Sequence, residues 1–136
     1  PRVHLAIDPE YAVGPDGTPI ETPGVITGDQ INAVQAYLEG IVQAHNLPPK
    51  LFVIHQFMDQ TVVDGDATQR FPDVDLVLNM DAYGDAQGKA DKYHLFATRP
   101  YAEHHSFNVF LQHDAPVATE ADVMRLTPQP DMVEYQ

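Results

Sequence analysis

Four short apolar runs in this sequence each end in polar residues whose side chains could bind a ligand or move a proton. The runs span 3–7, 51–54, the first half of 74–85, and 107–111. Parallel strands of α/β proteins present their carboxyl ends at one edge, where binding and catalytic groups gather. We therefore expect the residues that follow the runs to meet there. They are Asp8 and Glu10; His55, Gln56 and Phe57; Asp81, Tyr83, Gly84 and Asp85; and Gln112, His113 and Asp114.

Three of these residues are candidate catalytic acids. Asp8 and Glu10 flank Pro9, which fixes the backbone just past the first run, and Asp81 follows the third. Paired carboxylates cleave glycosidic bonds when they lie about 5–5.5 Å apart (retaining) or about 6.5–9.5 Å apart (inverting). We predict that Asp81, with Asp8 or Glu10, carries such chemistry. The alternative is that these acids only cap the loop or helix that follows.

The other residues are predicted to contact a substrate. His55 could transfer a proton or be a hydrogen-bonded core histidine. Gln56 suits hydrogen bonding to a sugar or an amide, Phe57 suits stacking on a sugar ring, and Tyr83 could orient Asp81. The fourth run adds the last three predicted substrate-binding residues: Gln112, His113 and Asp114.

Composition excludes several kinds of protein. Twenty acidic and seven basic residues give a net charge of −13, which argues against nucleic-acid binding and attachment to anionic membranes. No apolar run is long enough to span a membrane. The absence of cysteine excludes disulfides and thiolate ligands, and Ser106 is the only serine, without a nucleophile-elbow motif. No metal-binding motif is present, and the neighbouring His104 and His105 are interpreted as a solvated loop pair, so neither metal nor cofactor is predicted.

Helical and strand patterns alternate along the chain. Strands are predicted at 2–7, 50–54, from 74, and at 107–111; helices are predicted at 27–45, 58–63, 87–98 and from 119, followed by an extended tail at 127–136. The first helix is the clearest, because Thr27 and Gln30 form a capping-box pattern. Its expected core face carries Ile31, Val34, Leu38 and Ile41.

This alternation predicts an α/β fold with parallel strands and right-handed crossovers. Residues 1–136 would form one domain, either the C-terminal half of a (β/α)8 barrel or a small open doubly wound sheet. The half-barrel is favoured because every strand ends in polar residues, whereas an open sheet places its site at one switch point. The sequence opens at Pro1 inside a strand, so we expect a processed or cropped chain, or one piece of a longer protein.

Several motifs resemble those of an uncharacterised family of secreted bacterial proteins and lipoproteins, over most of the chain. The resemblance implies the C-terminal half of a glycoside-hydrolase-like barrel, in a protein located outside the cell or in the cell envelope. One motif departs from the family pattern, since Ala82 replaces an expected glycine. The motifs are Asp8-Pro9-Glu10, Leu47-Pro48-Pro49-Lys50, His55-Gln56-Phe57, and Asp81-Ala82-Tyr83-Gly84 with Lys89 and Tyr93.

Together these observations predict a barrel-type carbohydrate-active protein, with glycoside hydrolysis as its reaction. The alternative is a noncatalytic secreted or cell-envelope binding or structural protein on the same scaffold, because one fold supports many functions. A half-barrel needs a partner, either another chain or the missing N-terminal half. We expect that partner to contact residues 3–7 and 107–111.

Overall fold

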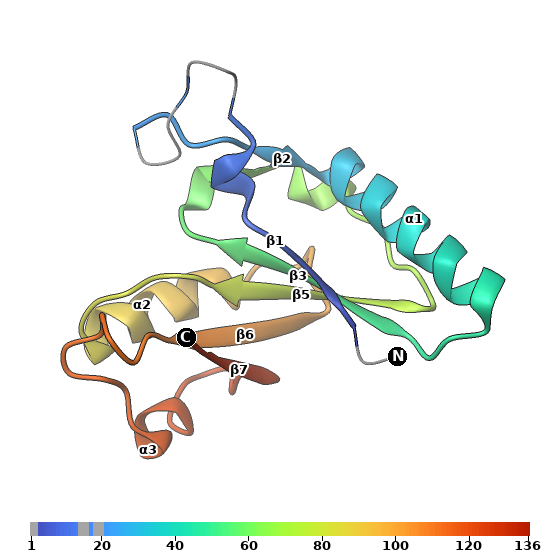
Figure 1. Ribbon diagram of the computed structural model, residues 1–136. Coiled ribbons are helices and arrows are strands. Elements are labelled where there is room, and N and C mark those ends of the chain that lie inside the picture. The colour runs from blue at the N-terminus through green and yellow to red at the C-terminus, as the bar shows by residue number, and fades with distance from the viewer. Residues whose placement is uncertain (1–2, 14–16, 18–20) are drawn as a thin grey trace.

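The computed structural model of the chain describes residues 3–13, 17 and 21–136. Its main feature is a curled sheet of five parallel strands, which follow one another across the sheet in chain order (Figure 1). The strands are β1 (Leu5–Ile7), β3 (Lys50–Gln56), β5 (Val74–Met80), β6 (His104–Val109) and β7 (Met132–Tyr135). A second, two-stranded parallel sheet pairs β2 (Ile26–Thr27) with β4 (Val62–Val63).

Three α-helices connect and cover the strands: α1 (Gly28–His45), α2 (Ala86–Phe96) and α3 (Glu120–Val123). Short 3-10 helices lie at η1 (Pro9–Tyr11), η2 (Asp59–Thr61) and η3 (Gly65–Ala67). Alternate side chains of the strands, such as Ile54, Leu78 and Phe107, pack with side chains from all three α-helices in one apolar cluster. The described helices therefore cover one face of the sheet and leave the concave face to its own side chains.

The first helix forms as its sequence predicts. The Thr27 hydroxyl accepts from the Gln30 amide, and the Gln30 side chain accepts from the Thr27 amide. Ile31 is completely buried, while Val34 and Leu38 pack against the core as partly buried side chains. Close approach of the chain fixes the helix start, because a Cβ on Gly28 would lie 2.4 Å from the Asp64 carbonyl oxygen.

Several details differ from the sequence prediction. The tail at 127–136 contains β7, the fifth strand of the sheet, so the prediction that 107–111 forms an outer edge was wrong. Strand β6 begins at His104, which places His104 and His105 in a strand. Residues 58–63 form η2 and β4, not one helix. The first strand was predicted from Arg2, which lies outside the described residues.

The strand order also separates the two predicted architectures. A doubly wound sheet reverses its strand order at a switch point and carries helices on both faces. Here the order β1-β3-β5-β6-β7 contains no reversal, and the described helices share one face. The parallel β/α units are therefore confirmed, and the doubly wound alternative does not describe this sheet. Within the described residues, no helix is long and apolar enough to cross a membrane.

Candidate functional site

Polar side chains line the concave face of the sheet toward the carboxyl ends of its strands. Register places His55 of β3 beside Asn79 of β5, and Asn79 beside Ser106 of β6. One step further along, Asn108 of β6 lies beside Glu134 of β7. These residues alternate with the apolar side chains that face the helices, because successive strand residues point to opposite faces. One face builds the core and the other builds a polar site.

His55 is the centre of this site. Its Nδ1 lies 3.1 Å from Asp8 Oδ1, and its Nε2 lies 3.2 Å from Glu134 Oε2. The Nε2 contact is an ion pair without the alignment of a good hydrogen bond. Asp8 follows β1 and Glu134 belongs to β7, so this one imidazole connects the two edge strands.

The charge of His55 follows from these neighbours. Burial lowers the pKa of His55, but the contact with Glu134 and the negative charges of Glu134, Asp81 and Asp8 outweigh it and raise the pKa to about 9. At neutral pH the ring is therefore an imidazolium, able to donate from both nitrogens.

Two asparagines hold the carboxylates of the site in place. The Asn108 side-chain amide donates to Asp81 Oδ1 at 2.7 Å. The Asn79 amide donates to Ser106 Oγ and to Glu134 Oε1, both at 2.8 Å. Both asparagines are completely buried. Their Oδ1 atoms have no hydrogen-bond partner among the described residues.

Glu10 and Asp81 are carboxyl groups shifted toward the protonated form. Burial raises the pKa of Glu10; its backbone hydrogen bond opposes the rise, and the negative charges of Asp8 and Asp81 add to it. Burial also raises the pKa of Asp81, although the charge of His55 and the Asn108 hydrogen bond oppose the shift. Carboxyl groups with raised pKa values are suited to donate a proton near neutral pH.

Both acids line one pocket of about 480 Å³ at the carboxyl edge of the sheet. Its other walls are mostly aromatic. Tyr83 packs edge-on to Phe110, with ring centroids 6.3 Å apart, and tilts toward His113. A mixed wall of aromatic rings and carboxyl groups can bind a ligand that has both apolar faces and hydroxyl groups. The lining residues are Glu10, Tyr11, Phe57, Asp81, Ala82, Tyr83, Phe110 and His113.

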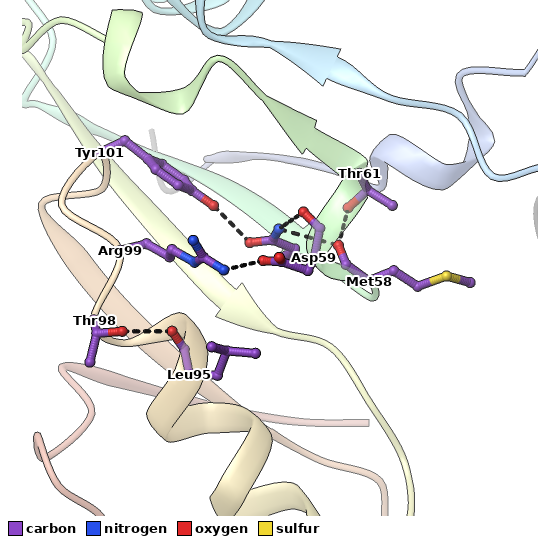
Figure 2. A network of polar contacts seen from close by, with 8 residues as sticks. Met58, Asp59, Thr61, Leu95, Thr98, Arg99 and Tyr101 are labelled. Carbon is purple, nitrogen blue, oxygen red and sulfur yellow. Dashed lines mark hydrogen bonds and ion pairs between the residues drawn. The ribbon is translucent and has the colours of Figure 1, made fainter.

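Gln56 points away from this pocket, although it was predicted to bind substrate. Its amide donates to the carbonyls of Met58 and Asp59, and its oxygen accepts from Tyr101. These three partners are labelled in Figure 2. The residue is completely buried, on the face of β3 opposite to His55. Figure 2 also shows Arg99 bonded to Asp59 in the same network. Gln56 therefore fixes the turn after β3.

The three residues predicted after the fourth run, Gln112, His113 and Asp114, lie in different surroundings in the structure. His113 lines the pocket, and Gln112 is exposed outside it. Asp114 is buried and paired with Lys89, and it also accepts from the amides of Gly84 and Phe110. Gly84 has a φ of 151°, a conformation that favours glycine. Asp114 thus supports the pocket wall from behind.

Lys89 and Lys92 of α2 could, by their place in the sequence, have paired with Asp81 or Asp85. Lys89 pairs with Asp114 instead, and Lys92 donates to the Phe57 carbonyl oxygen. Asp85 accepts from the Gly88 amide, so it caps α2. Burial lowers the pKa of Lys92, while the charges of Asp81 and Glu10 oppose that shift. Lys92 is therefore a second cation close to the site.

Sequence reasoning missed Asn79, Ser106, Asn108 and Glu134. The available signal was period-two alternation: a polar residue at every second position of an otherwise apolar strand marks the face turned away from the helices. Glu134 could not be recognised in this way because 127–136 was interpreted as a tail.

Two separate groups of side chains could each offer three ligand atoms to a metal ion, and the three atoms of each group lie within 4.8 Å of one another. The first group is Asp8, His55 and Asp81, and the second is Asp75, Glu103 and His104. The second group lies at the opposite end of the sheet. There, Arg70 pairs with Glu103 at 3.6 Å and His104 pairs with Asp131 at 3.5 Å.

Comparison with known proteins adds no relative: no family model, curated protein or solved structure matches the chain.

Proposed function

We propose that this chain forms part of a barrel-type hydrolase acting on carbohydrate. The observation that carries the proposal is that Glu10 and Asp81, both with raised pKa values, share one aromatic-walled pocket at the carboxyl edge of a parallel sheet. Glycosidic cleavage needs one carboxyl group to protonate the leaving oxygen and another to act as base or nucleophile. Aromatic rings such as Phe57 and Tyr83 suit the apolar faces of a sugar.

In this proposal Glu10 is the proton donor. It is nine per cent exposed, and its Oε2 has no hydrogen-bond partner among the described residues. Asp81 is the carboxylate, held by Asn108 and facing the positive charge of His55. Asp8 and Glu134 keep His55 charged, which stabilises negative charge at Asp81.

We further propose that the curled sheet is the C-terminal part of a (β/α)8 barrel and supplies five of its eight strands, one more than the half predicted from sequence. Five parallel strands in chain order, with helices outside and polar groups inside, support this arrangement. Among the described residues, strands β1 and β7 each pair on one side only, so another polypeptide would complete the wall. The resemblance to secreted bacterial proteins supports a location in the cell envelope or outside the cell.

The test is turnover of α- and β-configured nitrophenyl glycosides by the assembled protein, isolated in its native oligomeric state. We expect Glu10→Gln and Asp81→Asn to lower kcat at least about 100-fold while leaving the far-UV circular dichroism unchanged. The matched control is Glu103→Gln, which removes a carboxyl group at the opposite end of the sheet and should leave kcat unchanged.

A measurement of oligosaccharide binding distinguishes a hydrolase from the main alternative, a noncatalytic binding protein. Tyr83 is 66% exposed on the pocket wall, so Tyr83→Ala should weaken sugar binding without unfolding the protein. Binding that depends on Tyr83, without turnover, would show a noncatalytic carbohydrate-binding protein. Absence of both binding and turnover across the panel would refute a carbohydrate function.

A further inference from the structure

We propose that Asp8, His55 and Asp81 bind a divalent first-row transition metal ion. Two carboxylate oxygens and one imidazole nitrogen lie within 4.8 Å of one another there. A mixed nitrogen and oxygen set suits Zn²⁺ or Mn²⁺, whereas Ca²⁺ and Mg²⁺ favour sites made only of oxygen. Three protein ligands leave a coordination position open for water or substrate, as in catalytic zinc sites.

Acids and a histidine close together do not by themselves imply a metal. The independent observation is that Asn79 and Asn108, both completely buried, have side-chain oxygens that find no partner in the described part of the chain. The Asn108 side-chain nitrogen donates to Asp81 Oδ1, and the Asn79 nitrogen donates to Glu134, which contacts His55, so both buried amides adjoin the proposed site. Buried oxygens need a donor. Water molecules on a bound metal ion would supply donors to both asparagines.

The residues around the three ligands already have the arrangement of an outer coordination shell. A ligating histidine usually gives its second ring N–H to a carboxylate, which fixes the ring. If the metal takes His55 Nδ1 on the Asp8 side, Nε2 faces Glu134 at 3.2 Å. Asn108 orients Asp81 in the same way, through its bond of 2.7 Å.

The local charge also favours a cation. Asp8, Glu10, Asp81 and Glu134 all act electrostatically on this site. Because His55 must lose its extra proton to bind a metal ion, Lys92 is the neighbouring positive group that would remain. Lys92 donates to the Phe57 carbonyl oxygen, and no direct bond from it to any of these acids is recorded within the described residues. A divalent ion would offset the remaining negative charge.

One consequence rests on the proposed function. With metal on Asp8, His55 and Asp81, Glu10 would still donate the proton. Asp81 would act as a metal ligand in place of the base or nucleophile assigned to it above, His55 would bind in its neutral form, and a substrate hydroxyl could fill the open position. The site itself does not depend on that reaction, because metal binding is measured without substrate. Metal binding without glycoside turnover would therefore keep this inference and reject the hydrolase, and the reverse result would do the opposite.

The experiment is calorimetric titration of the tag-free, chelator-treated protein with Zn²⁺ and Mn²⁺, alongside Ca²⁺ and Mg²⁺. We expect one Zn²⁺ or Mn²⁺ per chain, bound more tightly than Ca²⁺ or Mg²⁺. His55→Gln and Asp81→Asn should abolish that binding. Asn108→Ala removes the bond that orients Asp81 and the proposed acceptor for a metal-bound water, and should weaken metal binding by about 10–100-fold.

The matched control is His104→Gln, which removes a histidine from the other three-residue group on the sheet and should leave the affinity unchanged. If His55→Gln fails to fold, the Zn²⁺-induced rise in melting temperature decides the question. That rise should persist in His104→Gln and disappear in Asp81→Asn. Absence of a one-to-one site, binding that survives Asp81→Asn, or loss of binding in His104→Gln would each overturn the proposal.

Discussion

His55 Nε2 and Glu134 Oε2 lie 3.2 Å apart, although β5 and β6 separate their strands in the sheet. Adjacent strands are about 4.8 Å apart, so the backbones of β3 and β7 would be roughly 14 Å apart in a flat sheet. Two side chains standing perpendicular to a flat sheet would not meet across that distance. The contact therefore requires the strong curl of this sheet, which brings β3 and β7 to one site.

The charge on His55 gives a pH prediction for chelator-treated protein. Its pKa of about 9 exceeds the ordinary value of 6.5, so the folded state binds the proton more tightly than the unfolded state. The stabilisation, on the order of 3 kcal/mol, is fully present below pH 6.5 and is lost as pH rises through 9. Urea unfolding of wild type and His55→Gln should therefore give a difference in free energy that shrinks between pH 6.5 and 10.

The control for this measurement is His94→Gln, since His94 is exposed and, within the described residues, its ring bonds to the Thr127 carbonyl oxygen alone. Its stability difference from wild type should not shrink over the same range. An NMR titration that gives His55 a pKa near 6.5 would contradict the charged network on the concave face.

Lys89 and Asp114 should be the most sensitive ion pair in the described structure. Both side chains are almost completely buried, at 2% and 0% exposure. Lys89→Met would leave the Asp114 charge uncompensated and should lower the free energy of unfolding by about 3–5 kcal/mol. The exposed pair of Arg125 and Asp122 is the comparison, and Arg125→Met should leave the urea midpoint nearly unchanged.

The double variant Lys89→Met/Asp114→Leu distinguishes the cost of an uncompensated charge from the loss of the hydrogen bonds that Asp114 makes to the backbone. If Lys89→Met destabilises the protein only because the buried Asp114 charge is left uncompensated, removing both charges should restore most of the free energy of unfolding. Asp114 also holds the Gly84 and Phe110 amides, however, so we expect only partial recovery. Full recovery would show that these two backbone bonds contribute little.

The position of Ile31 predicts a graded effect on the face of α1. Ile31 is completely buried, so Ile31→Ala should cost about 2–5 kcal/mol in urea unfolding. Leu38 is only partly buried and should cost less, and Tyr37, at 70% exposure, should cost within about 0.5 kcal/mol when replaced by alanine. Equal effects at Ile31 and Leu38 would mean that the helix packs in a different rotation.

The sequence predicted the elements whose signals are local. The capping box at Thr27 and the apolar spacing that follows belong to one helix, so α1 was located correctly. The apolar runs before His55 and Asp81 likewise identified β3 and β5. Parallel pairing followed from their alternation with helices. The same logic placed Asp8, His55 and Asp81 at one edge, where their ligand atoms lie within 4.8 Å.

The features that the sequence did not predict depend on contacts between residues far apart in the chain. Strand β7 has only four residues, and it is a strand because β6 pairs with it. Without β7, Glu134 had no assigned position, and the bonds from Asn79 and to His55 could not be anticipated. Asp114 resembled a site residue because it follows β6, whereas its burial with Lys89 depends on how α2 packs.

The open edges of the sheet give the last prediction. In the part of the chain that the structure describes, strands β1 and β7 each have a neighbour on one side only, and unpaired strand edges tend to associate. Beside β1, an apolar groove of about 280 Å³ is lined by Val3, Leu5, Leu38, Ile41 and Leu47, among others. Val3 is 74% exposed there. We therefore expect the 136-residue chain to associate in sedimentation velocity, with a larger fraction of oligomer at higher concentration.

A charge on this edge should weaken the association without unfolding the chain. Val3→Lys places an ammonium group where an apolar partner would pack, and a lysine on a strand edge opposes pairing. We expect its dissociation constant to rise by about tenfold or more, because a loss of about 1.4 kcal/mol already produces that change. Tyr37→Lys adds the same charge at an exposed position on α1 and should leave association unchanged. A monomer at every concentration, unfolding in one cooperative step, would show that these edges need no partner and would count against the proposed (β/α)8 barrel.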